Sequence, residues 1–170
     1  MAIHNYHSLL LDRHPRLLVV GHNEDQISEL VSMFVQSQSH IGIIGDEFPF
    51  LANLSILENI VLGAMYRQNI PLEKASKPLE EPIRALGLER WMEQRKEKLD
   101  QQTMGLCQLL RCIACGNSVV VLPSPMVAMA DTIIQATALL SPAPVVWIAC
   151  SVNNASAYDN LGLPTFHLES

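Results

Sequence analysis

The sequence predicts an α/β protein in which a mainly parallel sheet lies between two layers of helices. Short apolar runs rich in valine and isoleucine alternate with longer segments of helical periodicity, as in strand–helix–strand units. A chain of 170 residues that is 49% hydrophobic can fill one core, and its sequence contains no internal repeat or low-complexity tract. We therefore expect a single domain over residues 1–170, with three layers and with strands buried on both faces.

The N-terminal half of the sequence predicts short strands that lead into helices. In order, the expected elements are an apolar run at Leu9–Leu11, a turn at Asp12–Pro15, a strand at Arg16–Gly21, a helix at Glu24–Gln36, a strand at Ile41–Gly45 and a helix from Ser55 toward Arg67. Ser55 and Glu58 have the spacing of a capping box, which predicts the start of the last helix. The segment Asp46–Leu54 is rich in aromatic and proline residues, and we expect a loop with exposed hydrophobic side chains.

The C-terminal half continues the alternation. Pro71 begins a charged helical region that we expect to continue, with a break near Gly87, to about Lys98. The elements expected after it are a helix at Met104–Cys115, a strand at Ser118–Leu122, a helix at Val127–Leu140, a strand at Val145–Cys150, a helix at Asn153–Leu161 and a strand at Thr165–Leu168. Strands that alternate with helices in this way predict parallel pairing.

Composition and charge argue against several classes of protein. The formal net charge is −6 and the sequence has no block of lysine or arginine, so we expect no nucleic-acid partner. The first residues resemble no signal peptide, and no apolar run reaches the length of a membrane span, so we expect a cytoplasmic protein. The four cysteines are then expected to be free thiols.

Two groups of residues carry a resemblance to a known family. Phe48–Leu62, FPFLANLSILENIVL, is similar to the segment that follows the Q-loop in the nucleotide-binding domain of ATP-binding cassette (ABC) proteins. Ala85–Leu88, Leu99, Arg111 and Pro125 fall in register with that family's signature helix and Walker B strand. The resemblance implies a P-loop NTPase-like fold with a helical subdomain at about residues 55–115. The short interval between Ile27 and Asp46 implies a truncated antiparallel sub-sheet.

The positions that bind phosphate in this family are changed here. Against the phosphate-loop pattern G-x-x-x-x-G-K-[ST], the register places Gly21, Gln26, Ile27 and Ser28 at the defining positions. The second glycine and the lysine are therefore missing, and Glu24 and Asp25 bring negative charge. The family's Q-loop glutamine corresponds to Asp46, and its LSGGQ signature corresponds to Leu99–Thr103, LDQQT, which has no glycine.

The positions for metal binding and catalysis are changed as well. By the same register, the Walker B aspartate and the catalytic glutamate correspond to Pro123 and Ser124, and the switch histidine corresponds to Cys150. Phosphoryl transfer depends on the placement and charge of such groups, so we expect no catalytic residue and no bound cofactor. The alternative is a nucleotide-binding regulator or ATPase with a non-standard loop, in which Gly21, Ser28 and Asp46 hold the nucleotide.

The best-preserved part of the resemblance predicts a contact surface. In ABC proteins the segment after the Q-loop contributes to the groove that receives the membrane subunit, which here corresponds to Phe48, Pro49, Phe50 and Leu54. Packing within the protein is the competing explanation for these apolar residues. The resulting hypothesis is a catalytically inactive ABC ATPase-like subunit. Its partner would be a membrane transport subunit, a homologous ATPase or a second copy of the chain, and a membrane partner would bring it to the membrane.

The cysteine spacing allows a third interpretation. Cys107-x4-Cys112-x2-Cys115, with Cys150 farther on, matches the spacing of a plant-type iron–sulfur cluster. The first three lie in an apolar helical run without a glycine-rich loop, and free cysteine is among the most buried residue types, so we expect buried thiols and no metal. His4, His7, His14 and His22 also lack a repeated ligand spacing.

Overall fold

The computed structural model describes residues 14–36 and 40–169. Its centre is a five-stranded sheet in the order β2-β3-β4-β1-β5, and every pairing between these strands is parallel. The strands are β1 (Arg16–Gly21), β2 (Ile41–Ile43), β3 (Val119–Pro123), β4 (Val145–Ser151) and β5 (Thr165–His167). The predicted α/β class with a parallel sheet is confirmed.

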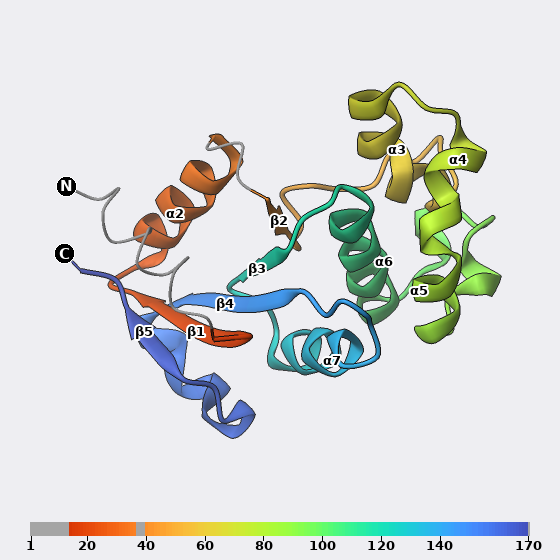
Figure 1. The fold of residues 1–170 in the computed structure, drawn as a ribbon. Coiled ribbons are helices and arrows are strands. Elements are labelled where there is room, and N and C mark those ends of the chain that lie inside the picture. Colours follow the sequence, from red (N-terminus) through yellow and green to blue (C-terminus); the bar gives the residue numbers. More distant parts are fainter. Residues whose placement is uncertain (1–13, 37–39, 170) are drawn as a thin grey trace.

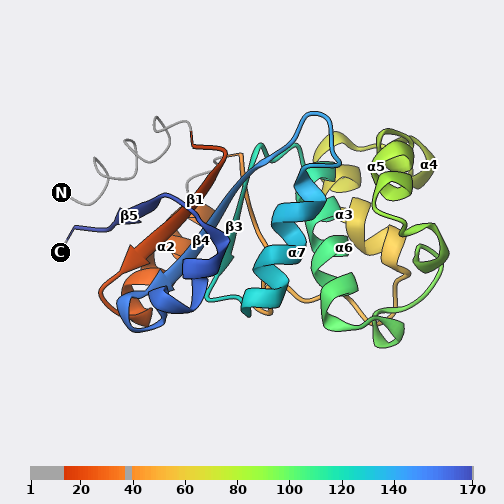
Figure 2. The ribbon, with the colours of Figure 1, turned by 90° about the horizontal axis from the view of Figure 1, so that it is seen from below.

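Helices cover both faces of this sheet (Figures 1 and 2). Helix α2 (Glu24–Gln36) packs on one face, against alternate residues such as Leu17, Val19 and Trp147. Helices α6 (Gln101–Ala114) and α7 (Val127–Thr137) pack on the other face, against residues such as Leu18 and Val20. Because successive side chains of a strand point to opposite faces, β1 serves both cores with one continuous apolar run.

A helical group lies beyond α6, at the end of the molecule away from β1 and β5 (Figure 1). Its elements are α3 (Ile56–Gln68), α4 (Leu72–Ser76), η1 (Lys77–Leu79), α5 (Glu80–Ala85), η2 (Glu89–Trp91) and η3 (Lys96–Lys98). They share a buried cluster with one side of α6 that includes Phe50, Ile60 and Leu110. The predicted capping box at Ser55 and Glu58 begins α3, with both of its hydrogen bonds formed.

The structure corrects the prediction of a helix from Gly87 to Lys98. Helix α5 ends at Ala85, Gly87 takes a φ of +66°, and only short 3₁₀ turns follow. The backbone carbonyls of Met92 and Gln94 instead accept hydrogen bonds from the N–H groups of Leu57 and Ile56. This segment therefore pairs with the otherwise unsatisfied first turn of α3, which outweighs its own helical pattern.

Smaller differences concern the ends of elements. Strand β2 ends at Ile43 and not at Gly45, and helix α7 ends at Thr137 and not at Leu140, so both are shorter than expected. The last predicted helix is a 3₁₀ helix, η4 (Val152–Leu161), and Gly162 ends it with a φ of +59°. The predicted run at Leu9–Leu11 lies outside the described residues.

Candidate functional site

The candidate site lies where β1, β4 and β3 end. Because these neighbouring strands are parallel, their carboxyl ends meet at one edge of the sheet, where open α/β sheets generally bind ligands. Gly21, Ser124 and Ser151 lie at or just past these strand ends, and Glu24 is in the first turn of α2. The fold thus brings together the positions that the resemblance assigns to the phosphate loop and to the catalytic glutamate.

Glu24 is the centre of the hydrogen bonds at this edge. Its Oε1 accepts from Ser151 Oγ at 2.6 Å and from Asn154 Nδ2 at 3.1 Å. Its Oε2 accepts from Ser124 Oγ at 2.8 Å. The hydroxyls of Ser151 and Ser124 are the main cause of the lowered pKa of Glu24, and burial opposes them only in part. The carboxylate is therefore ionised at neutral pH and fixed by three side chains from two other segments.

The backbone at Ser124 is strained. Its φ of +44° lies in the left-handed region that non-glycine residues seldom adopt. The Ser124 N–H donates to the carbonyl of Ala149 at 2.7 Å, so this end of β3 remains attached to β4. The turn presents the Ser124 hydroxyl to Glu24, at the position that the resemblance assigns to the family's general base.

The loop between β1 and α2 forms its own internal cap. Asn23 Oδ1 accepts from the N–H of Gln26 at 2.9 Å, and Gln26 Oε1 accepts from the N–H of His22 at 2.7 Å. A phosphate loop binds its ligand through free amide N–H groups of this kind. Here two of them already have side-chain partners. Space is limited too, because a side chain at Gly21 would lie 2.9 Å from Ile27 and 3.0 Å from Gln26.

The other residues of the predicted phosphate site are divided between core and surface. Ile27, at the lysine position, is 2% exposed and packs in the core beneath α2. Ser28 and Asp46 are exposed and line one hollow of about 230 Å³ together with Glu24 and Ser124. The structure therefore does bring Ser28 and Asp46 together, but the groups that face them are two further acids, Glu24 and Glu47.

The start of α6, at the signature position, is capped in the same way. Asp100 Oδ1 accepts from the N–H of Thr103 at 2.7 Å, and this hydrogen bond lowers the pKa of Asp100. Cys150, at the switch position, is fully buried in β4, and burial raises the pKa of its thiol to about 11. Neither residue is a cation, and the Cys150 thiol is not ionised at neutral pH.

The predicted contact segment follows β2 and is fixed by one buried amide. Pro49 and Leu51 are exposed, and Phe48 and Leu54 are half-buried. Phe50 is only 2% exposed and belongs to the helical core, so its side chain anchors the segment instead of forming its surface. Asn59 of α3 holds the segment through hydrogen bonds to the backbone of Leu51, Leu54 and Ser55.

The cysteines do not form a ligand set. In residues 14–36 and 40–169 no three histidine, cysteine or acidic side chains lie close enough to hold a metal ion. Cys107, Cys112 and Cys150 are buried, and burial raises the pKa of both Cys107 and Cys112 to about 12. Cys115 is partly exposed at the end of α6. Buried thiols with raised pKa values are poor nucleophiles and poor metal ligands.

The arrangement around Glu24 is not predicted by the resemblance. The resemblance gives Glu24 only as a negative charge in the phosphate-loop region, and it assigns no role to Ser151 or Asn154. The alternation of strands and helices in the sequence could have predicted part of this arrangement, because polar residues that follow adjacent parallel strands meet at one edge of the sheet. Ser124 and Ser151, which are the first polar residues at the ends of two such strands, satisfy that rule.

Replacing Glu24 with glutamine is expected to weaken the protein in a pH-dependent way. The folded-state pKa of Glu24 is lowered, so its stabilising effect is present above the unfolded pKa and is lost as pH falls through the folded value. The variant should lose about 1 kcal/mol at neutral pH, since the site is solvent-accessible, and the difference from wild type should shrink in acid. Urea unfolding of the variant and the wild type, at neutral pH and in acid, measures the difference in the free energy of unfolding. Asp25→Asn is the neighbouring control, and an equal loss at both pH values would contradict the assignment.

No helix in the described part of the chain combines the length and the hydropathy of a membrane span. No family model and no curated protein matches the sequence. Among solved structures, cbiO1 from Clostridium perfringens, part of the ABC transporter complex cbiONQ, is similar with a TM-score of 0.60. The match has 13% sequence identity and covers 80% of this chain and 66% of cbiO1.

MJ0796, a bacterial ABC transporter cassette with a dimeric structure, is also similar, with a TM-score of 0.62 and 15% identity. That match covers 83% of this chain and 77% of the cassette. Both matches cover most of this chain, and at these identities they establish its fold. The chain therefore has the fold of an ABC transporter cassette.

Proposed function

We propose that this protein is a catalytically inactive ABC-cassette-like subunit that acts through protein–protein contacts, as a structural or regulatory component of a transporter-type assembly. The observation that carries the proposal is the ionised Glu24 carboxylate, fixed by Ser124, Ser151 and Asn154 in the loop that would otherwise hold phosphate. A nucleoside triphosphate is a polyanion, and the Glu24 carboxylate would repel it. In addition, two amide N–H groups of the loop already have side-chain partners.

The groups that promote phosphoryl transfer also have no counterpart at the matching positions. Ile27 occupies the lysine position in the core, Ser124 occupies the base position, and Cys150 occupies the switch position as a buried thiol. Removing a single stabilising donor from an active site commonly costs about a hundredfold or more in rate. The simultaneous replacement of the cation, the base and the switch residue supports a protein that does not turn over ATP.

Contact with other proteins is then the function that the remaining surface supports best. Asn59 forms hydrogen bonds to the backbone of the segment Phe48–Leu54, and the segment exposes Pro49 and 49% of Leu51. Exposed apolar side chains on a backbone that is already hydrogen-bonded are suited to docking, because less entropy is lost on binding. The similar cassettes include one from a transporter complex and one with a dimeric structure, so a transport subunit, a homologous cassette and a second copy are the partners to test.

Titration with ATP and magnesium tests the inactive state. Calorimetry on the folded protein is expected to give no binding heat above dilution, and a phosphate-release assay should give no turnover above the buffer blank. Glu24→Gln is the matched variant, and binding that appears only in this variant would identify the carboxylate as the obstacle. Micromolar binding with turnover by the wild type would overturn the proposal. Binding without turnover would instead favour a nucleotide-binding regulator that uses Gly21, Ser28 and Asp46.

A further inference from the structure

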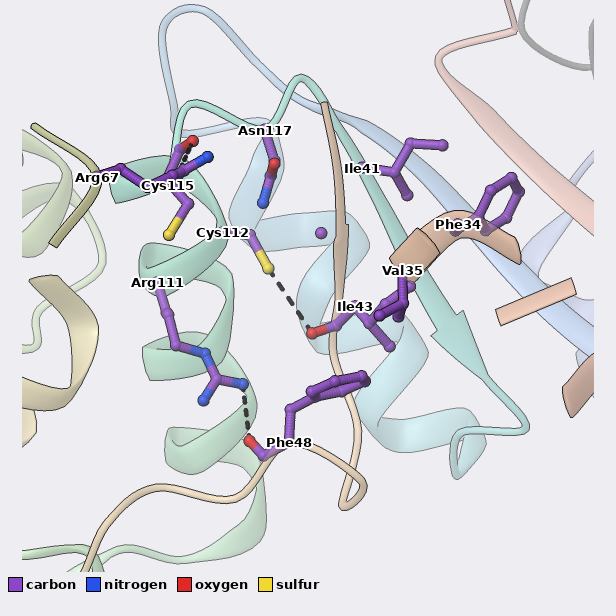
Figure 3. Close-up of a pocket in the computed structure, with 11 residues that line it drawn as sticks. Phe34, Val35, Ile41, Ile43, Phe48, Arg67, Arg111, Cys112, Cys115 and Asn117 are labelled. Carbon is purple, nitrogen blue, oxygen red and sulfur yellow. Dashed lines mark hydrogen bonds between the residues drawn. The ribbon is translucent and has the colours of Figure 1, made fainter. Parts of the chain in front are cut away.

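A second hollow, of about 420 Å³, lies beside the edge strand β2 and between the C-terminal ends of α2 and α6 (Figure 3). It shares no lining residue with the hollow beside Glu24. Its volume is within the range of about 300–1,000 Å³ that is usual for small-molecule pockets. We call it the β2 pocket, and its main side chains are those of Phe34, Ile41, Phe48, Arg67, Arg111 and Asn117.

One wall of the β2 pocket is cationic and polar. The guanidinium of Arg111 is partly buried, and burial lowers its pKa. Its Nη2 donates to the Phe48 carbonyl at 2.8 Å, and the group lies 4.9 Å from the centre of the Phe50 ring. Arg67 Nη2 donates to the Cys115 carbonyl. Within residues 14–36 and 40–169 neither arginine forms an ion pair.

Asn117 adds neutral polar groups to the same wall. Its side chain lies between Arg67 and the strand β2 in Figure 3. Among the described residues no hydrogen bond to its carboxamide is found. Asn117 therefore adds polar groups at the Arg67 end of this wall, and Arg111 supplies N–H donors at the Phe48 end (Figure 3).

The opposite wall is apolar and aromatic. Phe34 and Val35 of α2 and Ile41 and Ile43 of β2 lie across the pocket from the arginines, and the Phe48 ring is below them in Figure 3. Val35 is 54% exposed although it is apolar. Behind Phe34 lies Trp147, with ring centroids 6.2 Å apart. The pocket therefore separates donors for an anion from a surface for a flat or branched apolar body.

We propose that the β2 pocket binds a small amphiphilic anion, whose carboxylate, sulfonate or phosphate head lies at Arg111 and whose apolar body lies against Phe34 and Phe48. Charge-assisted hydrogen bonds from guanidinium groups are the strongest that such a head can receive. The ligand would supply the negative charge that the described residues do not place beside Arg111. This inference is independent of whether the carboxyl edge of the sheet binds nucleotide.

A pair of fluorescent probes separates the two walls of the pocket. 8-Anilinonaphthalene-1-sulfonate carries an anionic head on an aromatic body, and N-phenyl-1-naphthylamine is nearly the same body without the charge. The sulfonate should bind at one saturable site, at least about tenfold more tightly than the neutral amine, because it gains charge-assisted hydrogen bonds. In a Trp91→Phe variant, Trp147 is the remaining tryptophan, and it should transfer energy to the bound sulfonate.

Two arginine variants locate the site, with a third as control. Arg111→Gln should weaken binding of the sulfonate by about tenfold or more, and Arg67→Gln should weaken it less, because its guanidinium lies at the other end of the wall (Figure 3). Both variants should leave binding of the neutral amine unaffected. Arg84→Gln, which changes an exposed arginine on α5 outside the pocket, should bind like wild type. Should Arg111→Gln unfold, the comparison of the two probes on the wild type still decides, since equal affinity for both would contradict a charged head group at Arg111.

Thiol labelling gives an independent measurement. Cys115 lines the pocket and is the partly exposed cysteine of the four, so iodoacetamide should alkylate it first. Sulfonate at a concentration that just saturates the wild type should slow that alkylation in the wild type and slow it less in Arg111→Gln. Equal affinity for both probes, or binding of the sulfonate that is indifferent to Arg111→Gln, would overturn the proposal. Protection of Cys115 by a partner protein, but by no small anion, would assign the pocket to docking instead and would also overturn it.

Discussion

Replacing Ile27 with lysine is expected to lower the free energy of unfolding by about 3–5 kcal/mol, because it buries a cation without a partner. Ile27 is 2% exposed and packs in the cluster that contains Leu17, Val19 and Trp147. The substitution would recreate the lysine of a phosphate loop. The Glu24 carboxylate in the same turn of α2 is not free to pair with that lysine, because three other side chains already donate hydrogen bonds to it. Chemical denaturation monitored by circular dichroism measures the loss.

Ser28→Lys is the control for this prediction. Ser28 is the next residue of the same helix and is exposed, so a lysine there should change stability by no more than about 0.5 kcal/mol. If Ile27→Lys were as stable as wild type, the position would have room and polar surroundings for a lysine. An accompanying gain of ATP affinity would then mean that one substitution separates this protein from a functional phosphate loop, which contradicts the packing described above.

The parts of the fold that were predictable are those set by local chemistry. The β-branched runs that form β1, β3 and β4 and the capping box at Ser55 and Glu58 need only neighbouring residues to be recognised. Residues 88–98 do not form the predicted helix, because two of their backbone carbonyls accept hydrogen bonds from the first N–H groups of α3. These groups are more than thirty positions away along the chain. A periodic pattern cannot reveal such a tertiary hydrogen bond, which here decides the conformation of the segment.

The candidate site divides in the same way. A register against a known family is enough to predict which groups are missing at Ile27, Ser124 and Cys150, because each such prediction depends on residue type alone. What occupies their place depends on contacts across 100 to 130 positions, from Glu24 to Ser124, Ser151 and Asn154. The burial of Phe50 is also a matter of packing, since its neighbours Pro49 and Leu51 have comparable polarity and are exposed.

Replacing Asn59 with alanine is expected to destabilise the protein by about 2–4 kcal/mol, because several backbone groups lose their partner at a buried site. Asn59 is 4% exposed. Its Oδ1 accepts from the Leu51 N–H at 2.7 Å, and its Nδ2 donates to the carbonyls of Leu51 at 3.0 Å and Ser55 at 2.9 Å. These bonds determine the path of the predicted contact segment, so amide exchange at Leu51 should also become faster. Chemical denaturation and hydrogen exchange measure the two effects.

Leu51→Ser separates the stability of this segment from its function. Leu51 is 49% exposed, so the substitution should change stability by about 0.5 kcal/mol or less while it removes an apolar side chain from the contact surface. Under the proposed function, Leu51→Ser should reduce copurification of a membrane transport subunit or a cassette, and Leu139→Ser, at an equally apolar and 62% exposed position on the loop after α7, should not. Equal recovery of the partner with both variants would mean that Asn59 holds this segment for folding alone, and that the docking surface is elsewhere.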